Sequence, residues 1–366
     1  MNHRFAALLV AAAATIVSTP AAAQRPCDRA CLDGITAQFI QALAVNDASR
    51  LPLADGFRYT ENGQTLEWGN GLWGTLSAYA GQDWRTAPAA RELDYRISLA
   101  DPATGTIATA LEIDENGTRG VLVLRLKIVA AKIAEAEAIV VREEASGHRA
   151  GTVTLFQPPL LVTMDGQLVG PPDALFTADP TTGTPATTAA AMTSAATAYW
   201  TGLLAGRSKG VPIAADCQRR DNGVRTTGRS DAPPLDPKVK SFRPFELGCA
   251  AQIDSGFYTY LSRTRDQRFL ADPEKGLLMS IELVDNPGTT MALTVKGVGK
   301  VDYPGPRKPA GGLSGEQFDN RGWGPNLIAP ATGLSVTFYR FVDGKIARLD
   351  GFQRAGPYGL RSGWAK

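Results

Sequence analysis

The sequence contains the same segments twice in the same order, and this repetition constrains its fold more than any other feature. Residues 51–63 read LPLADGFRYTENG and residues 211–223 read VPIAADCQRRDNG, so a proline, an alanine, a carboxylate and Asn-Gly recur 160 residues apart. Two further segments recur downstream, Leu99–Pro102 as Leu270–Pro273 and Lys132–Ala134 as Lys345–Ala347. The pattern predicts two copies of one unit of about 120 to 170 residues, each with its own core.

The first 23 residues have the features of a cleavable secretory signal. Met1–Arg4 is a basic start, Phe5–Val17 is apolar, and Ala21–Ala23 supplies small residues before Gln24. No later stretch reaches the roughly 18 uninterrupted apolar residues of a membrane span. We therefore expect a periplasmic or secreted protein without membrane insertion.

The charge balance excludes a nucleic-acid partner. The chain has 38 basic and 36 acidic residues and a formal charge of +2, without a basic run or an aromatic-basic stripe. Its 20% charged and 44% hydrophobic residues are typical of a globular protein, which leaves a small molecule as the expected partner.

Four cysteines in an exported chain indicate two disulfides, and sequence alone permits three pairings. The simplest choice is local, because Cys27 and Cys31 are four residues apart while Cys217 and Cys249 flank the largest insertion of the second copy. A metal site or a Cys-His nucleophile is not expected, since His148 is the only histidine beyond the signal.

The first copy has the pattern of one helix followed by an antiparallel meander. Leu32, Ile35, Phe39 and Leu43 recur at helical spacing. Strands are predicted to begin near Phe57, to turn at Asn62-Gly63, and to continue over 94–100, 106–113, 120–129 and 132–142. This order indicates an α+β fold.

Composition divides the chain into four parts. Residues 1–23 are the signal, 24–145 the first domain, 146–190 a linker rich in Pro, Gly and Thr, and 191–366 the second domain. Segments 224–245 and 297–332 are expected to be long surface loops of the second domain.

The helix, the RYTENG segment and the closing pair RLKIVAAKIAEAEAIVVR resemble the nuclear transport factor 2-like (SnoaL-like) superfamily. The resemblance covers residues 27–145 and 192–355. It implies two tandem cone-shaped α+β barrels, each with N-terminal helices packed on a curved antiparallel sheet around a mostly apolar pocket. The superfamily contains isomerases, dehydratases, cyclases, epoxide hydrolases, enzymes that act on lignin-derived aromatic dimers, and plain binding or dimerisation modules. The fold alone therefore does not identify the function.

Acid–base chemistry in such a pocket would need carboxylates or tyrosines here, because neither barrel contains a histidine. Strand alternation places Tyr59 and Glu61 on the face of Phe57, with Arg219 and Asp221 in register in the second copy. Glu61, Tyr59 and Asp221 are the catalytic candidates, since an apolar pocket raises the pKa of a carboxylate. The alternative is a structural acid-Asn-Gly turn.

Seven residues are candidates for substrate contacts, and each has a structural alternative. The two tryptophans could line a pocket for a flat ligand or belong to the core. The arginines could bind an anionic group or form surface salt bridges, and the asparagines could serve the turns. The candidates are Trp68, Trp73, Asn62, Arg96, Arg219, Asn222 and Arg268.

No dinucleotide fingerprint, phosphate loop or nucleophile elbow occurs, which favours a mechanism without a cofactor. We expect an exported hydrolase or lyase that cleaves or rearranges a small hydrophobic oxygenated compound, such as an aromatic or lignin-derived aryl ether. The alternative is a non-catalytic small-molecule-binding or assembly protein. Under either hypothesis the copies are expected to pack as an internal pseudo-dimer with unequal pockets, and a homodimer is a further option.

Overall fold

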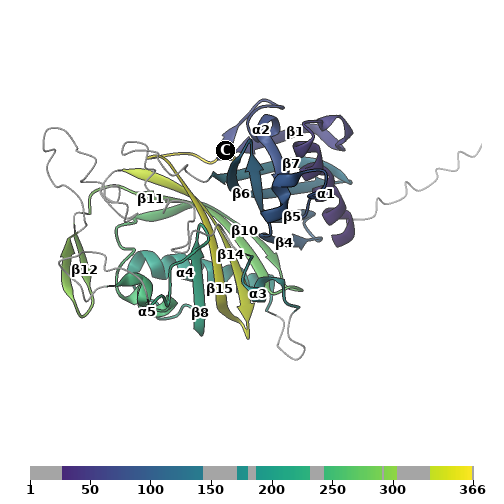
Figure 1. Ribbon diagram of the computed structural model, residues 1–366. Helices are drawn as coiled ribbons and strands as arrows, with labels where there is room; N and C mark the ends of the chain where they lie inside the picture. The colour runs from purple at the N-terminus through teal and green to yellow at the C-terminus, as the bar shows by residue number, and fades with distance from the viewer. Residues whose placement is uncertain are drawn as a thin grey trace, which may run out of the picture.

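The computed structural model describes residues 27–142, 171–179, 187–230, 243–290, 292–302 and 330–364. Within these ranges the chain forms two α+β units, each with a curved sheet and a long helix on one face of it (Figure 1). The α+β class predicted from the sequence is confirmed. The expected signal and His148 lie outside the described residues, and none of the described helices is both long and apolar enough to cross a membrane.

The first unit has one helix before its strands, as the periodicity predicts. Its sheet has the order β2-β1-β7-β6-β5-β3, with β4 also paired to β5, and β1 runs parallel to β7. The elements are α1 (Arg29–Ala44), η1 (Ala48–Arg50), β1 (Leu53–Glu61), β2 (Gln64–Thr65), α2 (Leu72–Thr75), β3 (Leu76–Tyr79), η2 (Pro88–Glu92), β4 (Arg96–Asp101), β5 (Thr106–Glu115), β6 (Thr118–Val129) and β7 (Lys132–Arg142).

The second unit has the sheet order β10-β11-β14-β15-β8-β9, and β8 runs parallel to β15. Strands β9 and β13 lie in segments that were expected to be loops. The elements are α3 (Ala174–Thr177), α4 (Ala189–Ala205), β8 (Ile213–Asp221), β9 (Val224–Arg225), η3 (Pro244–Glu246), α5 (Cys249–Asp254), β10 (Arg263–Asp272), β11 (Leu277–Asn286), β12 (Ala292–Val295), β13 (Gly299–Asp302), β14 (Ala331–Val342) and β15 (Lys345–Pro357).

The main strands of the two sheets are connected in the same way. Strands β1, β2, β4, β5, β6 and β7 correspond in order and pairing to β8, β9, β10, β11, β14 and β15. Both sheets are open, however, and not closed into the barrels that the sequence analysis expected. One edge of each sheet ends in a strand of only two residues, β2 or β9, which is too short to close a ring.

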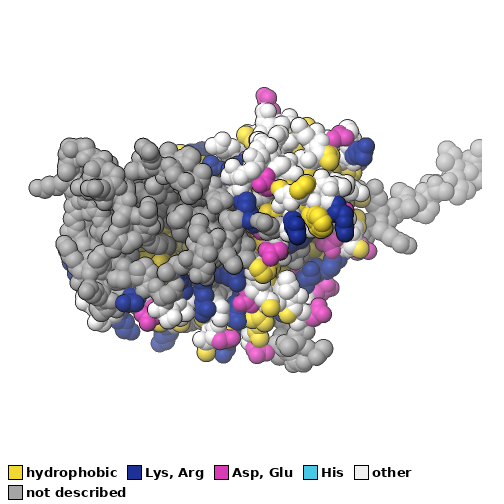
Figure 2. All heavy atoms as spheres, in the orientation of Figure 1, with side chains coloured by type: hydrophobic (Ala, Val, Ile, Leu, Met, Phe, Trp, Pro, Cys, Tyr) yellow, Lys and Arg dark blue, Asp and Glu magenta, His cyan; other side chains and the backbone are white. Residues whose placement is uncertain are grey.

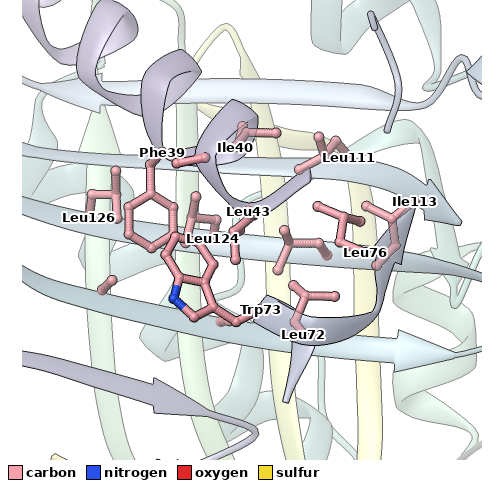
Figure 3. Packing of buried hydrophobic residues seen from close by; sticks show 14 of the residues in the cluster. Phe39, Ile40, Leu43, Leu72, Trp73, Leu76, Leu111, Ile113, Leu124 and Leu126 are labelled. Atoms are coloured by element: carbon pink, nitrogen blue, oxygen red, sulfur yellow. The ribbon is translucent and has the colours of Figure 1, made fainter. Parts of the chain in front are cut away.

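Each sheet is covered on one face by the helix that precedes it. Asp28 caps α1 by accepting a hydrogen bond from the Cys31 N–H, and Thr188 caps α4 in the same way. The apolar stripe predicted for α1 is buried, and it packs on the strands as Figure 3 shows. The helix positions in the two units are equivalent at the same 160-residue offset as the first strands.

The repeated Asn-Gly turn ties the first strand of each unit to its last strand. Both asparagines have positive φ, 52° at Asn62 and 47° at Asn222, a conformation that asparagine tolerates better than most residues. Each backbone N–H donates to the last strand, and each side-chain oxygen accepts from a backbone N–H two residues further on. In the first unit the Asn62 N–H donates to the Ala138 carbonyl (2.8 Å), and the Val140 N–H donates to Asn62 Oδ1 (2.9 Å). In the second unit the Asn222 N–H donates to the Gly351 carbonyl (2.7 Å), and the Gln353 N–H donates to Asn222 Oδ1 (2.8 Å).

The local disulfide pairing is confirmed. Cys27 pairs with Cys31 at the start of α1, and Cys217 on β8 pairs with Cys249 at the start of α5. The second bond therefore fastens the helical cover of the second unit to a strand of its sheet.

The two sheets pack against each other through the faces that α1 and α4 leave uncovered (Figure 1). α3, which lies within the predicted linker, adds Phe176 to this interface. The buried interface residues are Tyr95, Ile97, Leu99, Ala108, Ala110, Val121, Val123, Ile139 and Val141 of the first unit and Leu270, Leu277, Met279, Ile281, Leu283, Leu334, Val336, Phe338 and Phe352 of the second. The described residues thus contain two unit cores and a third core between the units.

Polar contacts also join the two units at this interface. The Tyr95 hydroxyl donates to Asp350 (2.9 Å), and the Arg29 guanidinium binds Asp272 (2.7 Å). Arg268 donates two hydrogen bonds to the buried Glu137, 2.5 and 2.7 Å long. Arg268 was a candidate for substrate binding, but its side chain binds across the interface because strand alternation turns it away from α4.

Arg268→Met is expected to destabilise the protein by about 1 to 2 kcal/mol, since Glu137 remains buried with Arg125 as its other partner. The midpoint of urea unfolding measures the effect. Arg50→Met, at a side chain 88% exposed, is the control and should change little. Equal midpoints for both variants would show that the contact contributes nothing to stability.

The described surface is mixed in charge. On the face seen in Figure 2, Lys and Arg side chains lie among Asp and Glu side chains over the first unit. This distribution agrees with the near-neutral charge of the sequence.

Candidate functional site

Glu61 of the first unit is fully engaged in local contacts. It is buried at the end of β1, where Oε2 accepts from the Leu72 N–H (2.7 Å) and Oε1 from Arg142 (3.2 Å). The hydroxyl of Tyr59 is 3.4 Å from Oε2. Burial and the neighbouring Glu61 raise the pKa of Tyr59. This carboxylate holds the start of α2 and the end of β7, which is the structural alternative considered from the sequence.

The aromatic candidates of the first unit form one cluster. Trp73 is buried and stacks on Phe39 with ring centroids 5.5 Å apart (Figure 3), so it belongs to the core and does not line a pocket. Trp68 is 38% exposed and lies edge-on to Trp73 at 4.4 Å. Arg96 is exposed, and its guanidinium reaches the Ala80 carbonyl at 3.4 Å.

The inner face of the first sheet is apolar. Figure 3 shows Phe39 and Ile40 of α1 facing leucines of the central strands. In register across β5, β6 and β7, the inner positions are Leu111, Leu122 and Val140 in one row, and Thr109, Leu124 and Ala138 in the next. This interior contains few polar groups that could act on a substrate.

The equivalent positions of the second unit are polar. In register across β11, β14 and β15, the rows read Glu282, Ser335 and Gln353, then Ser280, Thr337 and Gly351. Tyr339 replaces Leu126, Arg219 replaces Tyr59, and the helix contributes Tyr199 and Trp200 in place of Phe39 and Ile40. We call Tyr199, Trp200, Arg219, Asp221, Glu282, Ser335 and Tyr339 the inner polar cluster. All seven are buried.

Glu282 is the central acid of this cluster. Burial raises its pKa to about 8, and the facing groups of Ser280, Ser335, Thr337 and Trp200 lower it only in part. None of these groups has full hydrogen-bond geometry with either carboxyl oxygen. Glu282 is therefore mainly neutral near pH 7, and it has a pKa suited to proton transfer at that pH.

Arg219 and Asp221 form a buried ion pair on β8. Arg219 Nε donates to Asp221 Oδ1 (3.0 Å), and Arg219 Nη2 forms an ion pair with the same oxygen (2.9 Å). The Thr226 hydroxyl donates to Oδ2 (2.7 Å). Burial alone would lower the pKa of Arg219, but Asp221 raises it well above its usual value. Arg219 is thus a fixed cation, and Asp221 is a well-satisfied carboxylate whose geometry suits positioning Arg219.

Aromatic rings surround the ion pair. The Arg219 guanidinium lies 4.8 Å from the ring centre of Tyr258, and Tyr199 lies 6.0 Å from Tyr339. Burial raises the pKa of Tyr199 to about 12 and that of Tyr258 well above its usual value. Both phenols are therefore neutral at physiological pH, so these rings add no charge beside the ion pair.

The Cys217–Cys249 disulfide fixes the helical cover of this cluster. It anchors α5, whose Gln252 side chain donates to the carbonyl oxygens of Thr226 (2.6 Å) and Pro244 (2.8 Å). The Tyr258 hydroxyl donates to Gln252 Oε1 (3.1 Å), which holds the ring beneath Arg219. The disulfide and these hydrogen bonds therefore connect β8 to the Tyr258 ring through α5.

Replacing Cys217 and Cys249 with serine is expected to cost about 3 to 4 kcal/mol and to weaken ligand binding at the inner polar cluster. The matched control replaces Cys27 and Cys31, whose shorter loop predicts about 2 kcal/mol and no loss of binding. Urea unfolding and calorimetric titration measure the two effects. Equal loss of binding in both variants would contradict this positioning role.

Five buried polar atoms of the cluster have no hydrogen-bond partner. They are Trp200 Nε1, Arg219 Nη1, Ser335 Oγ and both carboxyl oxygens of Glu282. A buried polar group without a partner costs about 1 to 3 kcal/mol, so their concentration in one region is typical of a site that binds a polar ligand.

The site brings Arg219 and Asp221 together with Glu282, Tyr199, Trp200, Ser335 and Tyr339, which were not predicted as site residues. Glu282 lies in the segment LLMSIELVDN, which reads as an ordinary buried strand. The signal that could have identified it is the alignment of the repeats. Asp101-Pro102 and Asp272-Pro273 are 171 residues apart, and the same offset aligns Glu282 with Leu111 of the first unit.

Comparisons with known proteins add a family match to the second unit. A family described as a domain of unknown function, DUF8021, matches residues 185–351. The match includes α4, β8, β11 and β14 and thus most of the inner polar cluster. A search of curated proteins finds no match.

Solved structures with similarity are small proteins that align with part of the chain. A candidate polyketide cyclase from Xanthomonas campestris pv. campestris is 14% identical, covering 44% of this chain and 90% of its own, with a TM-score of 0.25. A second candidate polyketide cyclase, from Silicibacter sp., is 14% identical over 45% and 89%, with a TM-score of 0.25. A de novo designed NTF2 fold protein is 15% identical over 31% and 87%, with a TM-score of 0.20.

Proposed function

We propose that the chain consists of two tandem NTF2-like units, of which the second is an enzyme that needs no cofactor and the first is its structural partner. The equal strand connectivity and the helix on the inner face of each sheet support the duplication. The sheet-to-sheet core supports an internal pseudo-dimer. The apolar first interior and polar second interior support a single principal site.

The observation that carries this function is Glu282, a buried acid with a pKa of about 8 and no hydrogen-bond partner, in the cluster that also holds the Arg219 cation. The neutral carboxyl donates its proton to a hydroxyl or ether oxygen of the substrate. The carboxylate that results accepts a proton from the adjacent carbon, which expels the alcohol or water and restores the acid. Loss of water or alcohol across two carbons needs only this one group.

Arg219 assists by stabilising negative charge that develops on a carbonyl oxygen of the substrate. Its free Nη1 supplies the donor, and Asp221 and Tyr258 hold the guanidinium in place. We place the substrate among small hydrophobic oxygenated compounds, including aromatic and aryl-ether ones, because tyrosine and tryptophan rings form the walls. The reaction class is lyase or isomerase.

The earlier catalytic candidates take other roles in this proposal. Asp221 positions Arg219, and Glu61 with Tyr59 stabilises the first unit. The substrate contact proposed for Arg219 remains, whereas Asn62 and Asn222 serve the turns. Export to the periplasm or beyond is proposed as well, and two disulfides in the described chain are consistent with a secreted protein.

A substrate screen with mass-spectrometric detection tests the proposal. The purified protein is incubated with aromatic ethers, epoxides and hydroxylated ketones, beside Glu282→Gln and Glu61→Gln proteins. Product formed by the wild type and Glu61→Gln but not by Glu282→Gln supports the assignment. Equal product from all three proteins would show that the chemistry lies elsewhere.

Small-molecule binding without turnover is the second candidate function. It is favoured by the five unpaired polar atoms of the inner polar cluster, which a bound ligand satisfies without any reaction. Saturable binding without product across the whole screen would select this function.

A further inference from the structure

The sequence contains four Asn-Gly pairs, which begin at Asn62, Asn70, Asn116 and Asn222. An asparagine followed by glycine can lose its side-chain amide, because glycine has no side chain to hinder attack by its own backbone nitrogen. The reaction has two requirements. The side-chain carbonyl carbon must reach the glycine nitrogen, and that nitrogen must give up its proton. Burial and hydrogen bonds at either group therefore oppose it.

Asn62 and Asn222 are held by their side chains. Asn62 Oδ1 accepts from the Val140 N–H (2.9 Å), and Asn222 Oδ1 accepts from the Gln353 N–H (2.8 Å). The Asn222 side-chain nitrogen also donates to the Gln353 carbonyl (3.2 Å), and Asn222 is fully buried. Neither side chain can reach the following nitrogen unless the first strand of its unit separates from the last strand.

At Asn116 the side chain is not held, but the nitrogen is. Asn116 and Gly117 are exposed at the turn between β5 and β6, and no hydrogen bond with the described residues involves the Asn116 side chain. The Gly117 N–H donates to Asp114 Oδ1 (2.9 Å), and the Asn116 N–H donates to Ser77 Oγ (3.0 Å). This turn must therefore open before the Gly117 nitrogen can attack.

At Asn70 neither group is held. Residues 67–71 are all exposed, and the Asn70 backbone N–H donates to the Glu67 carbonyl (3.2 Å). Within the described ranges, neither the Asn70 side chain nor the Gly71 N–H takes part in a hydrogen bond. Unlike the other three asparagines, Asn70 does not have the positive φ of a tight hairpin turn.

The fold requires glycine at position 71. The φ of Gly71 is 67°, and a Cβ atom there would collide with the carboxylate of Glu61. Glu61 cannot easily move away, because it is buried and its Oε2 accepts from the Leu72 N–H (2.7 Å). A bulkier residue that would slow the reaction is thus excluded at this position.

We propose that Asn70 is a site of spontaneous deamidation in the folded protein, that Asn116 reacts more slowly, and that Asn62 and Asn222 are protected. The Gly71 nitrogen bonds to the side-chain carbonyl carbon of Asn70 and gives its proton to solvent. Solvent returns a proton to the amide nitrogen, which leaves as ammonia. Water then opens the cyclic imide at either carbonyl, which gives aspartate or isoaspartate.

The reaction changes the exposed edge of the first unit. Each product adds a carboxylate and lowers the formal charge of the chain by one, from +2 to +1. In the isoaspartyl product the backbone is also longer by one atom, directly before α2. Water is the only co-reactant, and no residue of the inner polar cluster takes part, so the result does not depend on the outcome of the substrate screen.

Peptide mapping by mass spectrometry tests the proposal. The purified full chain is kept folded in mildly alkaline buffer made with isotope-labelled water, so that deamidation during later peptide preparation carries no label. We expect Asn70 to be labelled first, Asn116 about tenfold more slowly, and Asn62 and Asn222 at least about 100-fold more slowly. Absence of label at Asn70, or equal labelling of Asn70 and Asn222, would overturn the proposal.

Two comparisons show whether the fold sets this order. In urea the four pairs should react within about threefold of one another, because the unfolded chain holds none of them. The folded order persisting in urea would assign it to local sequence and overturn the structural explanation. Ser77→Ala removes one hydrogen bond of the Asn116 turn and should speed labelling at Asn116 about fivefold, with no change at Asn70. An unchanged rate at Asn116 would overturn the role given to that turn.

Discussion

Glu282→Gln is expected to lower turnover by about 10²- to 10⁴-fold while the protein stays folded and keeps its affinity for ligand. The amide has the shape of the neutral carboxyl and still donates a hydrogen bond, but it cannot release or recover a proton. The substrate is the compound identified by the mass-spectrometric screen. Values of kcat and KM for wild type and variant measure the effect, which should fall almost entirely on kcat.

The matched control is Glu61→Gln in the first unit. This buried carboxylate corresponds to Asp221, and it is bonded to the Leu72 N–H and Arg142. Its replacement should reduce stability but leave kcat within about twofold of wild type. A Glu282→Gln protein with near-normal kcat would refute the assignment of the acid.

Stability is expected to fall as the pH rises from 6 to 8, through ionisation of Glu282. Its pKa is about 8 in the folded protein and near 4.3 in an unfolded chain. Because the folded pKa is raised, the neutral form is favoured by folding, and this contribution is lost as pH rises toward 8. The slope is at most about 1.4 kcal/mol per pH unit, or up to about 4 kcal/mol between pH 5 and 8.

Urea unfolding at pH 5, 6, 7 and 8 measures this loss, and Glu282→Gln should flatten the profile above pH 6. Asp350, whose pKa burial raises to about 6, contributes a loss of the same sign at lower pH. Asp350→Asn is therefore the control, since it should flatten the profile below pH 6 and leave the range from 6 to 8 unchanged. Identical slopes for wild type and Glu282→Gln above pH 6 would show that this carboxyl is not the titrating group.

Local patterns in the sequence predicted most of the elements correctly. The spacing of Leu32, Ile35, Phe39 and Leu43 predicted α1, and alternation predicted β4 to β7 within two residues of their observed ends. The Asn-Gly turns were predicted because they need a positive φ, and the disulfides because each pair is local. Sheet closure was not predictable, since it depends on how the edge strands end.

The candidate site was predicted only in part, because burial depends on three-dimensional packing. Arg219 and Asp221 follow from strand alternation, and both lie in the cluster. Arg268 has the same local pattern but turns to the interface, where Glu137 binds it. Glu282 looks like an ordinary residue of its own strand, and its difference is visible only by comparison with Leu111, at the equivalent position of the first unit.

The core shared by the two sheets has a consequence for how the protein behaves at low concentration. Two separate subunits joined by such a surface would dissociate on dilution, and each would expose the apolar face that Leu277, Phe338 and Val123 now cover. Because one chain carries both units, each face meets the other at an effective concentration set by the connecting segment, independent of protein concentration. The protein thereby keeps the two units paired at any dilution.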